Sequence, residues 1–162
     1  MKTILSFLLS ILAILAICNS CKKETTPEFY YKCKLNGQDY TYYACANCLQ
    51  CNILGDTVFI LAASTDYESI AVWHNDTKNG INIGNYQLSN STNPGGGFFY
   101  NQPYFSNYYY SDSINNGKLE ITQLDKANRI VAGTFYFDAY CAKYDSTVHI
   151  TEGKFRLKYT IN

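Results

Sequence analysis

The stretch "EFYYKCKLNGQDYTYYA", residues 28–44, carries the clearest fold signal in the sequence. Two aromatic-rich runs flank Asn36-Gly37, the dipeptide that most readily adopts the positive φ angles of a type I′ hairpin turn. Side chains alternate between the two faces of a strand, so each run also predicts which residues share a face. In the first run these are Phe29, Tyr31, Cys33 and Leu35, and in the second they are Tyr40, Tyr42 and Ala44. The stretch therefore predicts an antiparallel hairpin with a two-residue turn.

Further runs of strand length, rich in β-branched and aromatic residues, follow along the chain. They cover residues 57–63, 69–74, 81–88, 118–124, 129–139, 147–150 and 154–160. We expect turns at 125–128 and at 151–153, and a flexible loop at Gly95–Gly97. No segment has the i, i+3, i+4, i+7 apolar spacing of an amphipathic helix. The predicted fold class is all-β, with about eight to ten strands in an antiparallel sandwich or a partly closed barrel, of which we favour the sandwich.

The N-terminus, "MKTILSFLLSILAILAICNSC", has the parts of a secretory signal peptide: one lysine, an apolar run and a short polar stretch. The apolar run is shorter than the roughly 20 residues of a transmembrane helix. Cys21 follows the small residue Ser20, which resembles the lipid-attachment motif of bacterial lipoproteins. We predict a signal peptide at 1–20 that is removed, a lipidated cysteine and tether at 21–28, and one all-β domain at 29–162. The alternative is an ordinary signal peptide without a lipid.

The predicted location is the cell envelope, as an outer-membrane lipoprotein that faces the periplasm or the cell surface. Two acyl chains on Cys21 would anchor the protein stably where one would not. Thirteen basic and thirteen acidic residues cancel, so no net field points to nucleic acid or to an anionic membrane surface. We expect the membrane as a partner through the lipid, no nucleic-acid partner, and no cofactor.

Four motifs are similar to those of a family of uncharacterised Bacteroidota lipoproteins built as compact β-domains. In that family a G-x-Y strand precedes a G-x-L-x-I-T strand, a G-T-F-x-F strand and a terminal I-T-x-G-x-F strand. Here the motifs lie at 84–86, 117–122, 133–137 and 150–155. The resemblance implies an all-β fold and an envelope location. It implies no site residues, because the family has no established activity.

Five cysteines remain once the signal peptide and the lipidated residue are set aside: Cys33, Cys45, Cys48, Cys51 and Cys141. An oxidising envelope compartment favours disulfides among them, although an odd number leaves one thiol over. In the predicted hairpin Cys33 faces Tyr40, which puts Cys45 about 16 Å further along and too far for a bridge. Cys141 could reach Cys33 or the cysteine triplet at 45, 48 and 51. The alternatives are unpaired thiols, or a zinc site in which Cys141 or His149 completes the triplet.

The segment 95–112 places aromatic residues between polar ones. Tyr104, Tyr108, Tyr109 and Tyr110 could stack on sugar rings while nearby Asn and Gln side chains bind the hydroxyl groups. The alternative is a hairpin whose aromatic residues form cross-strand pairs and cover an edge, at about 0.2 to 1 kcal/mol per pair. We favour this second interpretation, since amphipathic tyrosines suit half-buried strands.

No residue is predicted to be catalytic, and both His74 and His149 are expected to be structural because no nucleophile motif lies near them. We expect a lipid-anchored envelope β-domain with a binding or structural role. The sequence does not identify its ligand, and a glycan and a protein are the two candidate classes. One alternative is a small zinc-binding or thiol-redox protein that uses the cysteine triplet. Another is a carbohydrate-binding module or a small glycan hydrolase. A hydrolase needs two converging carboxylates, and the candidates are Asp66, Glu68, Asp138 and Glu152.

Overall fold

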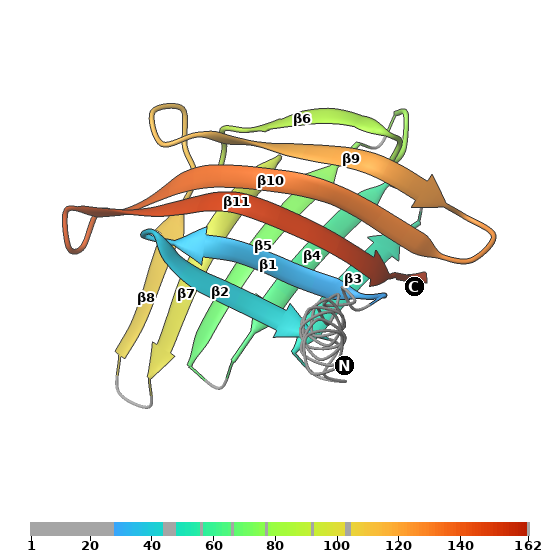
Figure 1. The fold of residues 1–162 in the computed structure, drawn as a ribbon. Helices are drawn as coiled ribbons and strands as arrows, with labels where there is room; N and C mark the ends of the chain where they lie inside the picture. Colours follow the sequence, from blue (N-terminus) through green and yellow to red (C-terminus); the bar gives the residue numbers. More distant parts are fainter. Residues whose placement is uncertain are drawn as a thin grey trace, which may run out of the picture.

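The structure is a computed structural model that describes residues 28–43, 48–55, 57–65, 67–76, 78–91, 93–102 and 105–161. Twelve strands lie within these residues, and no helix does (Figure 1). The strands are β1 (Tyr30–Leu35), β2 (Gln38–Tyr43), β3 (Leu49–Leu54), β4 (Val58–Ser64), β5 (Glu68–Asn75), β6 (Gly84–Leu88), β7 (Gly95–Gln102), β8 (Phe105–Tyr110), β9 (Gly117–Asp125), β10 (Ile130–Cys141), β11 (Ser146–Lys158) and β12 (Thr160–Ile161). No helix in this part of the chain is long and apolar enough to cross a membrane.

All twelve strands belong to one sheet that curls over on itself (Figure 1). The main path runs β12-β3-β4-β5-β7-β8-β10-β11-β1-β2, while β9 pairs with β10 off this path and carries β6 on its other side. The half that contains β1, β2, β9, β10 and β11 therefore lies across the core from β3, β4, β5, β7 and β8. The all-β prediction is confirmed. The single curled sheet corresponds to the partly closed barrel, rather than to the two-sheet sandwich that we favoured.

The C-terminal residues connect β11 in one half of the sheet to the β3 edge of the other half. Tyr159 follows β11, is almost fully buried, and donates its backbone N–H to the carbonyl of Arg129 at 2.9 Å. The next two residues, β12, pair with β3 in parallel, whereas every other pair in the sheet is antiparallel. One buried tyrosine thus marks the corner at which the chain passes from β11 to the edge of the opposite half.

The opening hairpin forms as predicted. Asn36 and Gly37 have φ angles of 49° and 82°, which are the two positive angles of a type I′ turn. Cys33 pairs with Tyr40, in the predicted register. The Asn36 side-chain oxygen also accepts the backbone N–H of His149 at 2.8 Å, so the turn is fixed to β11 as well as to its own strands.

The predicted turn at 151–153 is wrong, because β11 runs through these residues as one strand. Phe135 pairs with Gly153 whereas Phe137 pairs with Ile150, which leaves an extra residue in β11. That residue is Glu152, whose φ of 53° is typical of a β-bulge. Glycine is required beside it, since an added Cβ at Gly153 would lie 2.4 Å from the Phe135 carbonyl oxygen. A bulge and a turn use the same polar and glycine residues, so composition did not separate them.

The predicted loop at Gly95–Gly97 is also wrong. These three glycines begin β7 and are buried in the sheet, where Gly96 pairs with Val72 of β5 and Gly97 pairs with Tyr110 of β8. Residues 49–54, which include Cys51 of the cysteine triplet and were not among the predicted strands, form β3. The predicted strands near 57–63, 69–74, 118–124 and 129–139 are confirmed as β4, β5, β9 and β10.

The inward faces of the strands form one core. Its largest fully buried side chains include Tyr31, Phe59, Phe137 and Phe155. Phe135 links several of these rings, with its centroid 5.2 Å from that of Tyr31 and 6.4 Å from those of Phe137 and Phe155. This core fixes both halves of the sheet, so their outer faces are rigid surfaces on which a binding site can be built.

Candidate binding surface

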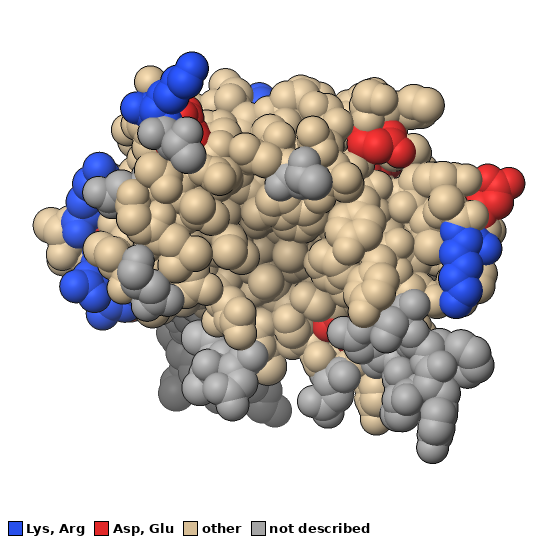
Figure 2. Space-filling view, turned by 180° about the vertical axis from the view of Figure 1, so that it is seen from behind, with Lys and Arg blue, Asp and Glu red and all other residues tan. Residues whose placement is uncertain are grey.

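Charge is distributed unevenly over the two halves of the sheet. β3, β4, β5, β7 and β8 contain a single Lys, Arg, Asp or Glu residue, Glu68. The other charged residues that lie in strands are on β1, β2, β9, β10 and β11. Figure 2 views the molecule from behind and shows charged groups at the margins of a largely uncharged surface. An outer face without charged residues can carry an exposed apolar patch, which is the feature that marks many interaction surfaces.

Four aromatic rings lie together on this outer face and are called the aromatic face: Trp73, Phe99, Tyr108 and Tyr110. The ring centroid of Phe99 is 6.4 Å from Trp73, 5.9 Å from Tyr108 and 5.7 Å from Tyr110. Both tyrosine contacts are edge-on, an arrangement that aromatic pairs prefer over a face-to-face sandwich. Tyr108 is 48% exposed and Tyr110 37% exposed, so their rings are held from one side and open to solvent on the other.

The glycines of β7 support this aromatic face. An added Cβ at Gly95 would lie 2.8 Å from the Trp73 ring, and one at Gly97 would lie 2.8 Å from the Phe99 ring. Both rings therefore rest directly on the β7 backbone, which only glycine allows at this distance. Gly96 points to the opposite side, where an added Cβ would lie 2.8 Å from the ring of buried Phe137. Gly95 and Gly97 thus leave room for rings on the outer face of the sheet, and Gly96 leaves room for a ring in the core.

The structure separates the tyrosines that the sequence grouped together. Tyr108 and Tyr110 lie on the outer face. Tyr109 lies on the inner face, packs against Phe98 with a centroid distance of 5.8 Å, and has its hydroxyl 3.3 Å from that of Ser146. Tyr104 lies outside the described residues. The predicted hairpin with cross-strand aromatic pairs is confirmed, because Phe98 pairs with Tyr109 and Phe99 with Tyr108.

A cleft of about 460 Å³ opens beside the aromatic face, between β8 and β10. It exists because β8 pairs with β10 at a single position, Tyr110 with Tyr140, and the two strands then diverge (Figure 1). We call it the β8–β10 cleft, and its lining residues are Ser91, Asn107, Tyr108, Tyr110, Ser111, Asp112, Tyr140, Cys141, Ala142 and Lys143. Its volume falls within the range of about 300–1,000 Å³ that is usual for small-molecule sites.

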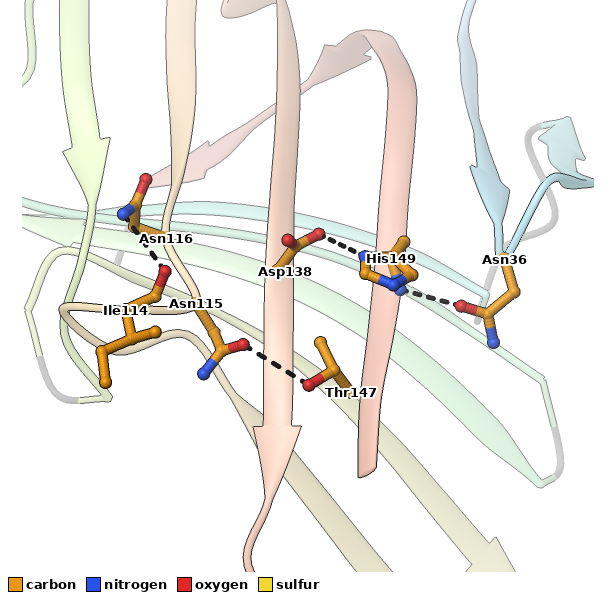
Figure 3. A network of polar contacts seen from close by, with 7 residues as sticks. All are labelled: Asn36, Ile114, Asn115, Asn116, Asp138, Thr147 and His149. Carbon is orange, nitrogen blue, oxygen red and sulfur yellow. Dashed lines mark hydrogen bonds and ion pairs between the residues drawn. The ribbon is translucent and has the colours of Figure 1, made fainter. Parts of the chain in front are cut away.

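Polar contacts hold the loop that borders this cleft (Figure 3). The Asp112 carboxylate accepts the backbone N–H groups of Ile114 at 2.7 Å and Asn115 at 2.6 Å. These hydrogen bonds, that from Asn115 first, lower the pKa of Asp112, so it is ionised at neutral pH. The Thr147 hydroxyl on β11 donates to the Asn115 side chain at 3.4 Å. The loop is thus tied to the sheet, although Ile114 at its tip is 86% exposed.

Two further groups complete the border of the cleft. The Tyr140 hydroxyl donates to Asp145 at 2.8 Å, which fixes the Tyr140 ring, and the Lys143 ammonium lies 4.8 Å from the Tyr144 ring centroid. Asn107 behaves differently, because its side-chain oxygen is buried and has no hydrogen-bond partner in the part of the chain that the structure describes. One acceptor in the wall of the cleft is therefore shielded from water and has no partner among the described residues.

The predicted disulfides do not form between described residues. Cys33, Cys51 and Cys141 are buried, free thiols, and burial raises the pKa of Cys33 and of Cys51 to about 12. Cys48 is not a free thiol, and Cys45 lies outside the described residues. The predicted reach of Cys141 to Cys33 is wrong for a geometric reason. Cys33 faces the β11 bulge, which is level with Phe135 on β10. Cys141 lies six residues further along β10, or about 20 Å at 3.3 Å per residue, against a limit of roughly 7 Å.

No group of three potential metal ligands occurs among the described residues. Cys51 belongs to the cysteine triplet, but it lies buried in β3 and no two further potential ligands gather around it among the described residues. Two of the carboxylates that the sequence offered as catalytic candidates have ion-pair partners in the structure. Glu152 pairs with Lys34 at 2.7 Å, Asp138 pairs with the His149 ring at 2.7 Å (Figure 3), and Asp66 lies outside the described residues.

A second cavity, of about 360 Å³, lies over the β11 bulge on the charged half of the sheet. Asp39, Glu152 and three lysines border it, and Lys34 takes up the charge of Glu152. This cavity contains no buried polar atom that lacks a partner among the described residues. The β8–β10 cleft, together with the aromatic face, is therefore the stronger candidate binding surface.

Sequence reasoning named two members of this surface, Tyr108 and Tyr110, and placed Phe99 in the same aromatic segment. It did not single out Asn107 among the polar residues of that segment, and it missed Trp73. Trp73 and Phe99 lie on strands whose register against each other was not predicted, because Gly95–Gly97 was interpreted as a loop. Asn107 has no distinguishing sequence signal, since its importance comes from burial of its side-chain oxygen. A strand assignment for the three glycines would have brought Trp73 opposite Gly95 and revealed the aromatic face.

The comparisons with known proteins give one match. A family model described as "Domain of unknown function (DUF6252)" matches residues 35–157. No curated protein and no protein of solved structure matches the chain. The matched range begins at the last residue of β1 and ends one residue before the end of β11. It therefore includes the aromatic face and the β8–β10 cleft.

Proposed function

Because the chain belongs to the DUF6252 family, whose function is unknown, we propose from its own residues that it is a binding domain held at the cell envelope by a lipid on Cys21. Eight residues separate that cysteine from β1, and they reach at most about 30 Å when fully extended. A domain on such a tether stays close to the membrane and meets ligands there. The apolar N-terminal run followed by Ser20-Cys21 supports the anchor.

The observation that carries the binding role is the aromatic face on an uncharged half-sheet. Its rings are fixed by edge-on contacts with Phe99 and by direct packing on glycine backbone, so little conformational entropy is lost when a ligand covers them. Rigid, amphipathic tyrosines with two rotatable side-chain angles are the residues that binding surfaces use for this reason. A glycan or a protein fits this surface better than a nucleic acid, because no positive charge lies in the strands that form it.

Site-specific photocrosslinking in cells tests the binding role. A photoreactive phenylalanine analogue in place of Tyr108 should give a covalent adduct with an envelope component on irradiation. The same analogue in place of Tyr136, which is 53% exposed on β10 and outside the aromatic face, is the matched control and should give none. Equal adduct yields at both positions, or no adduct at 108, would refute a binding role for this surface.

The anchoring part has its own test. Wild type and Cys21→Ala are grown with a clickable fatty acid, and label and membrane fractionation are compared. Wild type should carry label and sediment with membranes, while Cys21→Ala should do neither. A wild-type protein without label would exclude the lipid anchor and leave the binding role to be judged from the crosslinks alone.

A further inference from the structure

The β8–β10 cleft combines three features that together specify a ligand class. The first is a pair of exposed rings, Tyr108 and Tyr110, each supported from behind by Phe99. Tyr140, opposite Tyr110 in the register, adds a third ring whose hydroxyl is held by Asp145. Flat, fixed aromatic surfaces pack well against the C–H face of a pyranose ring, which is apolar on one side and has hydroxyl groups around its edge.

The second feature is the Asn107 side-chain oxygen. A buried acceptor without a partner carries a free-energy cost that folding does not recover. A hydroxyl group brought into the cleft would remove this cost by donating a hydrogen bond. This oxygen has no accessible surface in the unliganded protein although Asn107 lines the cleft, so the Asn107 amide must turn toward the cleft for a ligand hydroxyl to reach it.

The third feature is the balance of charge. Asp112 is ionised and held by backbone N–H groups, and Lys143 lines the same cleft. One negative and one positive group cancel at longer range, so the cleft attracts neither anions nor cations. Both groups can bind hydroxyls, since a carboxylate accepts and an ammonium donates.

From these features we propose that the β8–β10 cleft binds a neutral saccharide, with a pyranose ring against Tyr108 and Tyr110 and a hydroxyl donating to Asn107 Oδ1. This inference rests on the proposed binding role and names its ligand class. The sequence suggested a row of consecutive tyrosines, but Tyr109 faces the core. The proposed site is instead the cleft, which is lined by residues from both faces of β8.

The test is calorimetric titration of the full-length protein in a detergent without a sugar headgroup. The probes are neutral hexasaccharides of β-1,4-glucan, xylan and mannan, with oligogalacturonate as the charged comparison. We expect at least one neutral probe to bind and oligogalacturonate to bind at least tenfold more weakly. Emission from Trp73, the only tryptophan of the chain, should change in the same titration, because its ring contacts Phe99 and Tyr110.

Asn107→Leu separates a ligand-binding role from a structural one. Leucine has a similar shape and no acceptor, so the unfolding temperature should equal or exceed that of wild type while saccharide affinity falls about tenfold. Tyr108→Ala and Tyr110→Ala should each weaken binding by about fivefold to tenfold, and Tyr136→Ala should leave it unchanged.

Several results would overturn the proposal: no binding of any neutral probe, tighter binding of oligogalacturonate, or an Asn107→Leu variant that loses stability and keeps its affinity. If no saccharide binds but Tyr108 crosslinks to a protein in cells, this inference fails while the proposed binding role stands. If neither occurs, both fail.

Discussion

Replacing Gly96 by alanine tests whether the three glycines form a buried strand or an open loop. The added Cβ would lie 2.8 Å from the Phe137 ring, whereas carbon atoms pack best at about 3.5–4.0 Å. Phe137 is 1% exposed and packs against Phe135 at 6.4 Å, so its ring cannot move outward to make room. Overpacking of this kind costs about 1–3 kcal/mol. For a domain of this length the unfolding temperature should fall by roughly 3–15 °C.

Thermal and urea unfolding, followed by circular dichroism, measure this cost. Gly84→Ala is the matched control, since nothing lies closer than 4.0 Å to an added Cβ there, and it should be neutral or slightly stabilising. Phe137→Leu combined with Gly96→Ala should recover part of the loss, with a coupling energy of about 0.5–2 kcal/mol. If Gly96→Ala unfolds like wild type, or the two changes are additive, Phe137 does not pack on β7 and the reasoning is refuted.

Three further predictions concern groups outside the binding surface. Neither ring nitrogen of buried His74 has a hydrogen-bond partner among the described residues, and burial lowers its pKa. The unfolded chain therefore takes up a proton near pH 6.5 while the folded chain does so only at lower pH, so stability should fall as the pH drops below about 6.5. In His74→Phe the urea midpoint should depend less on pH between about 7.5 and 5.5, and an unchanged slope would contradict this. Burial raises the pKa of Cys33 and Cys51 to about 12, so iodoacetamide at neutral pH should modify them only after unfolding; mass spectrometry that finds both labelled in native protein would disprove it. Asn36→Val places a β-branched residue at a φ of 49° and should cost about 1–2 kcal/mol more than Asn36→Gly, which loses the same hydrogen bond to His149 without the strain, and equal urea midpoints would exclude this account.

The sequence predicted the parts of the fold that depend on local chemistry. Asn36-Gly37 determines a turn whatever surrounds it, and strict alternation in 129–139 defines both a strand and its inward face. The sequence failed where neighbouring strands decide the outcome. A Gly-Gly-Gly segment has no preference of its own, and it becomes a strand here because the rings of Trp73, Phe99 and Phe137 occupy the space that side chains would need.

The charged residues show the same limit. A net charge of zero correctly describes the whole chain but conceals a division between the two halves of the sheet. That division arises from topology, because β3, β4, β5, β7 and β8 are neighbours in the sheet and all have few charged residues. Composition along the chain shows that each segment is uncharged, whereas only the strand order shows that these segments form one surface.

The position of β8 in the sheet bears on the two interpretations of its tyrosines. If their role were to cover an edge, the exposed edge of β8 would be shielded. Instead β8 meets β10 only at Tyr110, and its described sequence, FSNYYY, contains no lysine, proline or charge of the kind that protects open edges. The rings of Tyr108 and Tyr110 pack against Phe99 of β7 and do not cover that edge. Their exposed rings and the open edge therefore border the same cleft, which is the arrangement expected if a ligand, and not the protein itself, covers them.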